Sequence, residues 1–378
     1  MSQIDKLIAD LCPEGVEFRT LKSLARRSKG TSITAARMKA LSRPSGEIRV
    51  FAGGKTFADV DASAIPSGDV ITTPSIIVRS RGNIDFTYYD KPFSHKSEIW
   101  SYSTSQPDVE QRFIYYYLTT LTSHLQEVAR ATSVKLPQLA VKDTDLLRIP
   151  VPPLEVQREI VRVLDKFTQL EAELEAELEA RHHQYKYYQK TLLTPADKSY
   201  HTASLGELFE LRAGKFISAT LITPERDAEH PIPCFGGGGL RGYVSSHNQN
   251  GDLVLIGRQG ALCGNVKRAS GKFYATEHAV VVSPKSAVDI RWAFHLLSHM
   301  NLNQYASKSA QPGLSVNMLK QLSVPVPPLP VQVATASILD KFDSLVNDLS
   351  IGLPAELAAR RKQYEYYRDR LLTFEEKR

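Results

Sequence analysis

Basic side chains cluster near the start of the chain, in a stretch that contains no acidic residue. Between residues 18 and 46 the cationic residues are Arg19, Lys22, Arg26, Arg27, Lys29, Arg37, Lys39 and Arg43. Set among Ser, Thr and Gly, such side chains can follow a phosphate backbone, because neutralising the phosphates releases condensed counterions from a nucleic acid. The stretch could equally be a solvated basic face, and the sequence leaves both interpretations open.

Three short motifs that could hold a cofactor or a metal fail on inspection. Gly54-Lys55-Thr56 ends like a phosphate-binding loop, but Arg49 stands where the first glycine of that loop is needed. Phe235-Gly236-Gly237-Gly238-Gly239 loosely fits an S-adenosylmethionine site but lacks its Asn/Asp-Pro-Pro-Tyr/Phe partner, so we expect a tight loop. His182 and His183 are neighbours on a predicted helix and point about 100° apart, so they cannot chelate one metal. We therefore expect no catalytic residue, no metal site and no cofactor bound by this chain.

Length and composition indicate two globular parts. The chain has 378 residues and a net charge of +6 at pH 7, which is too long for one ordinary core and suits two domains. The cysteines are too widely spaced for a disulfide framework or a zinc site, and they are Cys12, Cys234 and Cys263. No run of about 18 apolar residues could span a bilayer, and the first residues lack the pattern of a secretory signal. We expect a cytoplasmic protein.

Three blocks of sequence recur in the same order. The paired blocks are Pro150–Gln157 with Pro325–Gln332, Leu164–Phe167 with Leu339–Phe342, and Gln184–Tyr188 with Gln363–Tyr367. The first two pairs have an offset of 175 (339 minus 164), and the third has an offset of 179 (363 minus 184). A period this long predicts duplication of a whole globular-plus-helix unit, and hence pseudo-two-fold symmetry with two similar ligand sites.

Each copy contains a long predicted helix with apolar residues at alternating steps of three and four, which is typical of a coiled-coil seam. The residues predicted to pack between the helices or to contact a partner are Ile160, Phe167, Leu174, Tyr185 and Tyr188 in the first copy, and Ile338, Phe342, Leu349, Tyr364 and Tyr367 in the second. We expect the two seams to pack against each other in antiparallel fashion. The alternative is two unrelated helices, each packed on its own domain.

The sequence also indicates where the two predicted helices differ in length. The second seam has one extra step of four residues beside Gly352 and Pro354, so we expect a kink or a break there. In the first helix, Glu171-Ala172-Glu173-Leu174 is repeated at once as Glu175-Ala176-Glu177-Leu178. Each such tetrapeptide adds about 6 Å of helix.

The globular parts are predicted to be mixed α/β domains with twisted mixed sheets, separated by two long antiparallel helices that form a coiled coil. Predicted strands are 70–73, 76–79, 253–256 and 279–283, and predicted helices are 109–130 and 288–305. Fainter correspondences join Val50–Gly54 to Cys234–Gly238, Gly68–Val70 to Gly251–Leu253, and Leu139–Val141 to Leu314–Val316. The predicted boundaries are 1–149 for the first domain, 150–194 for the first long helix, 195–323 for the second domain and 324–374 for the second long helix.

With its Pro-Pro-Leu-x-x-Gln, Leu-Asp-Lys-Phe and Gln-Tyr-x-Tyr-Tyr blocks each present twice, the chain resembles the specificity subunit of type I restriction-modification enzymes. The resemblance covers essentially the whole chain. It implies two target recognition domains, each reading one half of a bipartite, asymmetric DNA site, and helices that set the spacer and dock two copies of an adenine methyltransferase subunit. It also implies that S-adenosylmethionine, ATP and Mg²⁺ are bound by the methyltransferase and restriction subunits, and that the assembly serves DNA methylation and phage defence.

Candidate DNA contacts follow from side-chain chemistry. Arg and Lys pair with guanine edges, Gln and Asn pair with adenine, and loops leaving a rigid sheet bring such side chains outward. The predicted DNA-binding residues are Arg26, Arg27, Lys29, Arg79, Arg81 and Lys96 in the first domain, and Arg241, Arg258, Gln259, Lys267 and Arg268 in the second. Each could contact a phosphate or cap a turn instead of reading a base.

Other functions remain open at this stage. The chain could serve a methyltransferase-only or other phage-defence complex that has no endonuclease. It could also be a scaffold whose coiled coil joins two protein-binding domains, or an enzyme with an unrecognised site in a Gly-rich loop.

Overall fold

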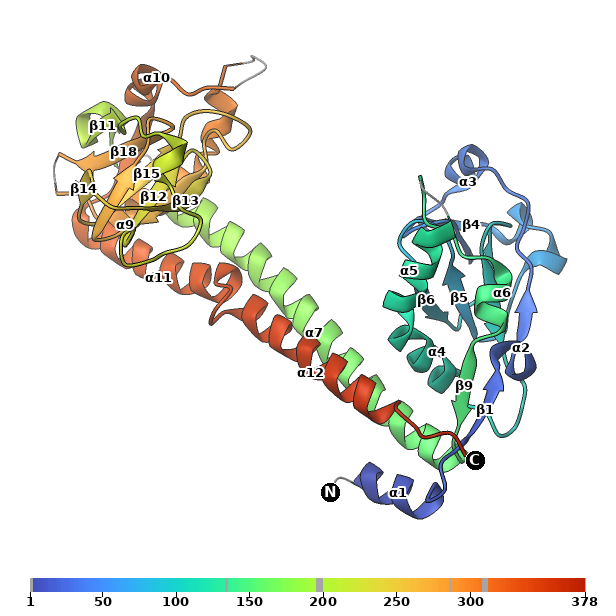
Figure 1. Ribbon diagram of the computed structural model, residues 1–378. Helices are drawn as coiled ribbons and strands as arrows, with labels where there is room; N and C mark the ends of the chain where they lie inside the picture. The colour runs from blue at the N-terminus through green and yellow to red at the C-terminus, as the bar shows by residue number, and fades with distance from the viewer. Residues whose placement is uncertain (1–2, 133–134, 195–199, 286, 308–311, 378) are drawn as a thin grey trace. The chain divides into compact units, whose positions relative to one another are not determined.

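The computed structural model describes residues 3–132, 135–194, 200–285, 287–307 and 312–377. The chain divides into two compact units, one made of Met1–Glu173 with Ala358–Arg378 and the other of Leu174–Leu357. Each unit therefore contains one globular part together with portions of the long helices (Figure 1). The predicted start of the second domain, 195–199, lies outside the described residues.

The first unit contains two sheets and a two-stranded ribbon. The antiparallel sheet has the order β2 (Arg26–Ser28), β8 (Trp100–Ser103), β5 (Ser75–Arg79), β6 (Asp85–Tyr89). The mixed sheet has the order β4 (Phe57–Val60), β3 (Ile48–Phe51), β7 (Phe93–His95), with β3 and β7 parallel. The ribbon joins β1 (Glu17–Thr20) to β9 (Arg148–Val151). The short helices are α1 (Gln3–Leu11), α2 (Leu21–Leu24), α3 (Ala35–Leu41), α4 (Gln111–Thr120), α5 (Thr122–Thr132) and α6 (Val141–Asp145).

The second unit repeats this topology strand for strand. Its antiparallel sheet is β11 (Phe209–Ala213), β18 (Ala279–Pro284), β15 (Leu253–Gly257), β16 (Val266–Ala269). Its mixed sheet is β13 (Gly239–Val244), β12 (Ile232–Gly236), β17 (Lys272–Ala275), β14 (Gln249–Asn250), and its ribbon joins β10 (His201–Ser204) to β19 (Ser323–Val326). The short helices are α8 (Leu205–Leu208), α9 (Ile290–His299) and α10 (Val316–Gln321). The shared order, with β14 as an addition, confirms the predicted duplication and the mixed α/β fold.

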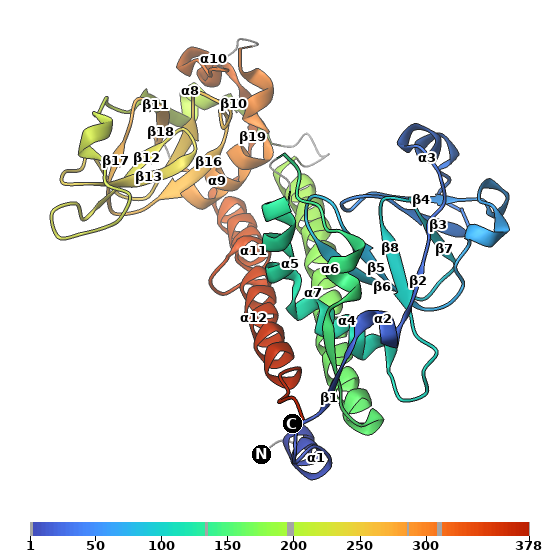
Figure 2. The same ribbon diagram turned by 45° about the vertical axis from the view of Figure 1, so that its right-hand side comes forward.

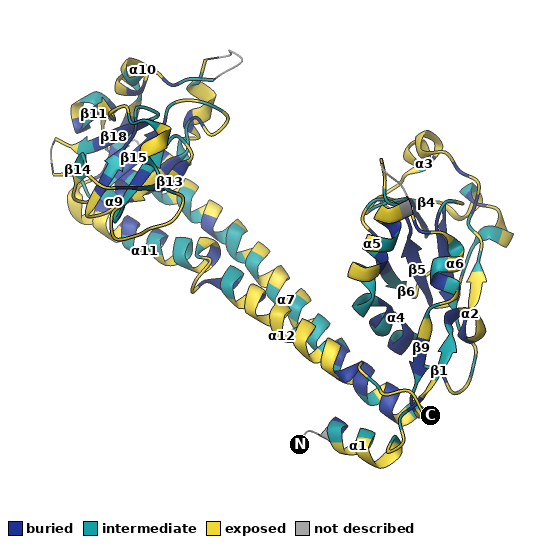
Figure 3. Cartoon of the chain, viewed as in Figure 1, coloured by how far each residue is buried: buried dark blue, intermediate teal, exposed yellow. Residues whose placement is uncertain are grey.

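Strand β5 shows how the layers are held together. All of its residues are buried, because Ile76 and Val78 join the core beneath α4 and α5 whereas Ile77 joins Phe51 and Phe93 of the mixed sheet. The antiparallel sheet thus lies between helices on one face and the mixed sheet on the other (Figures 1 and 2). A strand covered on both faces reads as a continuous apolar run, which is why its sequence predicted it correctly. Figure 3 shows these inner strands as buried.

Several predicted elements differ from the structure. Strands 76–79, 253–256 and 279–283 are confirmed within β5, β15 and β18. The predicted strand 70–73 is wrong, because the short 3₁₀ turn Ser67–Asp69 precedes it and Ile71 forms only an isolated bridge with Phe93. The match of Gly68–Val70 with Gly251–Leu253 fails for the same reason, since Leu253 begins β15. Helix 109–130 is divided at Leu121 into α4 and α5, and 288–305 is divided at Asn301, whose φ is 47°.

The long helices are α7 (Leu154–Leu193), α11 (Leu329–Asn347) and α12 (Leu353–Leu371). The predicted break is confirmed between α11 and α12, where the Asp348 carboxylate accepts the backbone N–H groups of Ser350 (2.7 Å) and Ile351 (3.2 Å). Gly352 is required there, because a Cβ would stand 2.5 Å from the Ser344 carbonyl oxygen. Among the described helices, none is both long and apolar enough to cross a membrane.

The helices pair along their predicted seams inside each unit. In the first unit, the Phe167 ring of α7 stacks on Tyr367 of α12 at 5.6 Å, and Glu171 pairs with Arg361 at 2.6 Å. From the first contact to the second, the residue number rises along α7 and falls along α12, so the two helices are antiparallel. In the second unit, Phe342 of α11 stacks on Tyr188 of α7 at 5.1 Å. The seams therefore pack on each other, as predicted.

Candidate nucleic-acid interface

Two loops meet at the same place in both globular parts. The backbone N–H of Leu139 donates to the Ser80 carbonyl, and that of Leu314 donates to the Arg258 carbonyl, at 2.9 and 2.8 Å. Ser80 and Arg258 are therefore equivalent positions. By the same register Arg79 corresponds to Gly257, and Arg81 corresponds to Gln259. In each part this loop, which follows β5 or β15, lies against the loop that follows β3 or β12.

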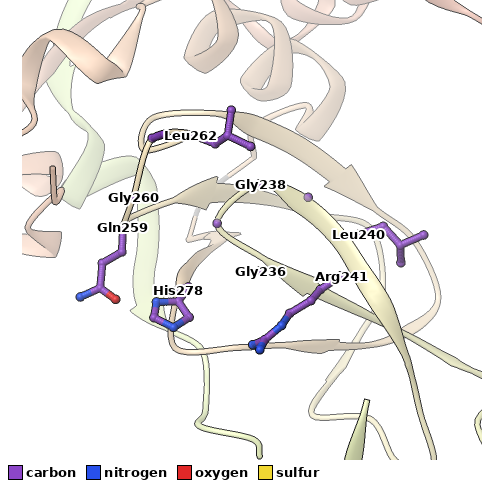
Figure 4. A pocket seen from close by; sticks show the side chains of 11 residues that line it. Gly236, Gly238, Leu240, Arg241, Gln259, Gly260, Leu262 and His278 are labelled. Atoms are coloured by element: carbon purple, nitrogen blue, oxygen red, sulfur yellow. The ribbon is translucent and has the colours of Figure 1, made fainter. Parts of the chain in front are cut away.

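The second-domain loops enclose a cavity of about 630 Å³. Its lining comprises Gly236, Gly237, Gly238, Gly239, Leu240, Arg241, Gln259, Gly260, Ala261, Leu262 and His278. Figure 4 shows Arg241, Gln259 and His278 reaching it from three different segments. Gly257 lets the glycine loop approach the strand closely, because a Cβ at Gly257 would stand 2.0 Å from the Gly237 carbonyl oxygen. Beneath the lining residue Gly236, Thr276 has a buried hydroxyl with no hydrogen-bond partner in the described part of the chain.

The first-domain loops enclose the equivalent cavity, of about 720 Å³. Its lining includes Arg81, Lys96, Glu98, Gly53 and Gly54, together with residues of α3. Its apolar lining residues include Met38, Phe57 and Leu136. The two cavities therefore occupy equivalent positions in the two domains, but different side chains line their edges.

Arg79 does not line this cavity. It is 8% exposed, and its guanidinium donates to the Gly54 carbonyl and to the Thr87 hydroxyl. It also lies 5.7 Å from the Phe51 ring centre. Burial lowers the pKa of Arg79. The predicted DNA contact is therefore contradicted, because this guanidinium is used inside the domain to hold the glycine loop against the sheet.

Arg81 and Lys96 do lie at the cavity. The Arg81 guanidinium is exposed and donates twice to the Gln138 side-chain oxygen, at 3.1 and 3.0 Å. The Lys96 ammonium pairs with Glu98 at 2.7 Å. Both contacts orient a cation at the cavity edge while leaving other donor positions for a ligand.

Arg26, Arg27 and Lys29 lie on or beside the edge strand β2 and are exposed. The Arg27 guanidinium nitrogen is 3.9 Å from the Asp145 carboxylate, a loose contact. None of the three lines the first-domain cavity. They form a separate basic edge, which suits phosphate contact better than base recognition.

In the second domain, Arg241 and Gln259 line the cavity and are exposed. Lys267 is exposed on β16, and its side chain lies beside Gly239 at the cavity edge. Arg258 is half-buried and does not line the cavity. Arg268 is exposed on β16, and its guanidinium lies 3.8 Å from the Asp340 carboxylate of α11; it does not line the cavity, and its predicted DNA contact stays a prediction.

The repeated Leu-Asp-Lys-Phe block supplies a carboxylate that ties each domain to its helix. Asp165 accepts from Arg112 at 2.5 Å and from the Tyr116 hydroxyl at 2.6 Å. Burial raises the pKa of the Tyr116 hydroxyl. In the second unit Asp340 lies 2.9 Å from His295 and 3.6 Å from Arg291.

The repeated glutamine has a similar anchoring role, which its residue type did not reveal. Gln157 donates to the Pro152 carbonyl at 2.7 Å and accepts the Glu110 N–H at 2.8 Å, at the start of α4. Gln332 makes the same two contacts, to the Pro327 carbonyl at 2.8 Å and the Asp289 N–H at 3.0 Å. The recurrence of the Pro-Pro-Leu-x-x-Gln block is the only sequence signal of this joint.

Most of the predicted helix-packing residues lie in the seam. Ile160 and Tyr185 are buried, and the half-buried members are Phe167, Leu174, Tyr188, Phe342 and Tyr364. Tyr367 is partly exposed but stacks on Phe167. Two of them do not pack in the seam: Leu349 lies in the break and is 82% exposed, and Ile338 is 42% exposed. For these two, contact with a partner subunit stays a prediction.

No cluster of three His, Cys, Asp or Glu side chains suited to a metal ion occurs within the described ranges.

A family model described as the type I restriction modification DNA specificity domain matches residues 13–180 and 198–359, one match in each globular-plus-helix repeat.

Relatives and solved structures agree with that match. The EcoprrI specificity subunit of Escherichia coli is 46% identical over 250 residues, which are 63% of this chain and 62% of that subunit. The EcoR124I/EcoR124II specificity subunit of Escherichia coli is 30% identical over 324 residues, 77% of this chain and 79% of that subunit. The S subunit of a type I system from M. genitalium shares the fold, with a TM-score of 0.67 at 18% identity over 95% of this chain and 96% of that one. The chain therefore belongs to the family of type I restriction-modification DNA specificity subunits, which are non-catalytic.

Proposed function

We propose that this chain gives a type I restriction-modification complex its DNA specificity, with each globular domain reading one half of a bipartite target. The observation that carries the proposal is the cavity built at equivalent loops of both domains. Loops positioned by a rigid sheet are where recognition residues concentrate. Two copies of one site on a duplicated chain fit two half-sites on one duplex.

The side chains at the cavities support an asymmetric target. The first domain presents Arg81 and Lys96, whereas the second presents Arg241 and Gln259. Arg and Lys favour guanine edges, and Gln favours adenine. Two domains of one topology with different edge chemistry would read different half-sites.

The long helices are the proposed docking surface for two methyltransferase subunits and, through them, for the restriction subunits. Their length would set the unread spacer between the half-sites. The chain itself would bind no cofactor, and S-adenosylmethionine, ATP and Mg²⁺ would be bound by the partner subunits. The family assignment and the helix pairing in each unit support this arrangement.

Methylation mapping with single variants tests the bipartite reading. Arg81→Ala and Gln259→Ala should each relax one position in one half-site by about 1–3 kcal/mol, while the other half-site stays strict. Arg226→Ala, which removes an exposed cation away from the second-domain cavity, is the matched control. Uniform weakening over all positions, or loss in both halves from one substitution, would contradict the proposal.

A further inference from the structure

Each cavity has an exposed apolar side chain at the same register of its mixed sheet. Phe51 of β3 corresponds to Phe235 of β12, and their partners across the hairpin are Phe57 and Leu240. Phe57 is 48% exposed and Leu240 is 55% exposed, and each lines the cavity of its own domain. Single exposed apolar residues are common on protein surfaces. Here, however, the same position is apolar in both domains although the residues beside it differ.

A second exposed leucine lines each cavity from another loop. It is Leu136 in the first domain and Leu262 in the second. Figure 4 shows Leu240 and Leu262 on separate segments around the second-domain cavity. Leu262 lies directly on the glycine loop, because a Cβ at Gly238 would stand 2.7 Å from its Cδ1 atom. Both cavities therefore combine hydrogen-bonding side chains with exposed apolar ones.

Phe57 is held in a fixed orientation. The Arg49 guanidinium carbon lies 4.1 Å from the centre of the Phe57 ring. The guanidinium nitrogens donate to the Asp59 carboxylate at 2.7 and 2.9 Å. Because the ion pair fixes the cation and the cation–π contact fixes the ring, a ligand group that touches the exposed part of Phe57 would order few rotamers on binding.

The polar neighbours indicate which ligand group these apolar side chains would touch. Under the proposed function, Arg81, Lys96, Arg241 and Gln259 pair with base edges in the major groove. The apolar group that a base edge presents in that groove is the C5-methyl group of thymine. A half-site that is methylated at adenine contains at least one thymine, because thymine is the pairing partner of that adenine. Both half-sites would therefore offer such a methyl group.

We propose that Phe57 and Leu240 each contact the C5-methyl group of one thymine, in different half-sites, a proposal that rests on the proposed function. The contact buries the methyl group against the ring of Phe57 or the side chain of Leu240. Each domain would then distinguish thymine from other bases at one position by an apolar contact as well as by hydrogen bonds. Loss of one buried methyl group corresponds to about a fourfold loss of affinity.

The test uses the full chain assembled with methyltransferase subunits, and a duplex that carries the target found by methylation mapping. Thymines are replaced one at a time by deoxyuridine, which lacks only the methyl group. Dissociation constants measured at one salt concentration should show, in each half-site, a thymine whose replacement weakens binding about fourfold. Phe57→Ala should abolish this preference in one half-site only, and Leu240→Ala should abolish it in the other half-site only.

Three further variants are controls. Phe57→Leu keeps an apolar side chain and should still bind the thymine duplex more tightly than the deoxyuridine duplex. Leu146→Ala and Leu221→Ala, at exposed leucines that line neither cavity, should leave both preferences unchanged. Because all the substituted residues are exposed, thermal unfolding of the variants should match that of the unsubstituted chain.

A thymine preference that persists in both alanine variants would overturn the inference, and so would its absence from the unsubstituted complex. Equal weakening toward both duplexes in the alanine variants would also contradict it, because the side chains would then insert between bases or pack on sugars. If the assembled complex neither bound nor methylated DNA, the proposed function itself would fail, a result distinct from all of these.

Discussion

At the residue scale, Arg79 and Gly257 occupy equivalent backbone positions in the two domains. Each holds the neighbouring glycine loop against the sheet, one with a long side chain and the other with none. In the first domain a guanidinium fills the space between the sheet and the glycine loop, and it binds the Gly54 carbonyl. In the second domain the absence of a side chain at Gly257 lets the loop settle directly on the strand. Both solutions fix the loop that forms one wall of the cavity, so the edge residues can vary without loss of its shape.

Arg79→Ala should destabilise the first domain by about 1–3 kcal/mol, because it leaves the Gly54 carbonyl without its donor and removes a buried side chain. Urea unfolding followed by the fluorescence of Trp100, which lies in that domain, measures the change. Arg81→Ala, at an exposed position two residues along, should change stability by less than about 0.5 kcal/mol. Equal effects of the two substitutions would show that Arg79 does not hold the loop.

We expect buried His295 to make the second unit less stable in acid. Burial lowers its pKa, although Asp340 at 2.9 Å acts in the opposite direction. The other charged or titratable groups that act on it are Tyr185, Arg268 and Asp343, and Arg291 lies 3.6 Å from its partner Asp340. Because the unfolded chain protonates this histidine at a higher pH than the folded chain, stability is complete above the ordinary pKa of about 6.5 and declines as the pH falls below it.

His295→Gln should therefore flatten the loss of stability below about pH 6.5, although it lowers stability at pH 7 by removing a packed ring. Thermal unfolding at a series of pH values measures the slope. His247→Gln, at an exposed position, should leave the slope as it was. A variant as acid-sensitive as the unsubstituted chain would place the titrating group elsewhere.

At the element scale, the repeated blocks are joints between helix and domain. Phe167 and Phe342 stack on tyrosines of the paired helix, while the neighbouring aspartates bind the domain. One short block thus joins three elements. This explains why these blocks recur while the surrounding domains differ: the joint needs specific partners, whereas the sheets need only apolar residues in the right alternation.

Leu339 and Leu349 lie on either side of the end of α11, and the apolar spacing of the sequence does not distinguish them although their burial differs. Leu339→Ala should cost about 2–5 kcal/mol, because Leu339 is fully buried between helix and domain. Leu349→Ala should cost less than about 0.5 kcal/mol, because Leu349 is exposed in the break. Denaturant unfolding of the two variants compares them, and a large loss from Leu349→Ala would indicate that the helix continues through this point.

Sequence periodicity predicted the buried strands, the long helices, their pairing and the site of the break, since these depend on local apolar spacing. It placed Leu349 in the helix seam because the apolar spacing of three and four residues continues in the sequence across the break, where the helix itself stops. It misjudged Arg79 because the Gly54 carbonyl that holds this side chain lies on another strand connection, 25 residues away. The equivalence of Arg81 and Gln259 was also hidden, because it appears only when the strand registers of the two domains are compared.

At the scale of the whole molecule, both long helix tracts cross from one compact unit to the other, between Glu173 and Leu174 on α7 and between Leu357 and Ala358 on α12. The tandem Glu-Ala-Glu-Leu tetrapeptides, residues 171–178, straddle the α7 crossing. The last residue of the repeat, Leu178, packs against the edge of the second-unit core, whereas the glutamates between are mostly exposed. Under the proposed function, a change of helix length at this repeat would change the separation of the two recognition domains.

Inserting one more Glu-Ala-Glu-Leu after Leu178 should lengthen α7 by about 6 Å while keeping the apolar seam on one face. At about 3.4 Å per base pair, the unread spacer in the methylated target should widen by one or two base pairs, while both half-site sequences stay the same. Methylation mapping of the insertion variant in the assembled complex measures the spacer, and Glu175→Gln with Glu177→Gln, which alters charge but not length, is the control. Because each half-site depends only on the loops of its own domain, an altered half-site sequence would show that the insertion disturbed the domains. An unchanged spacer would show that helix length does not set the distance between the two recognition events.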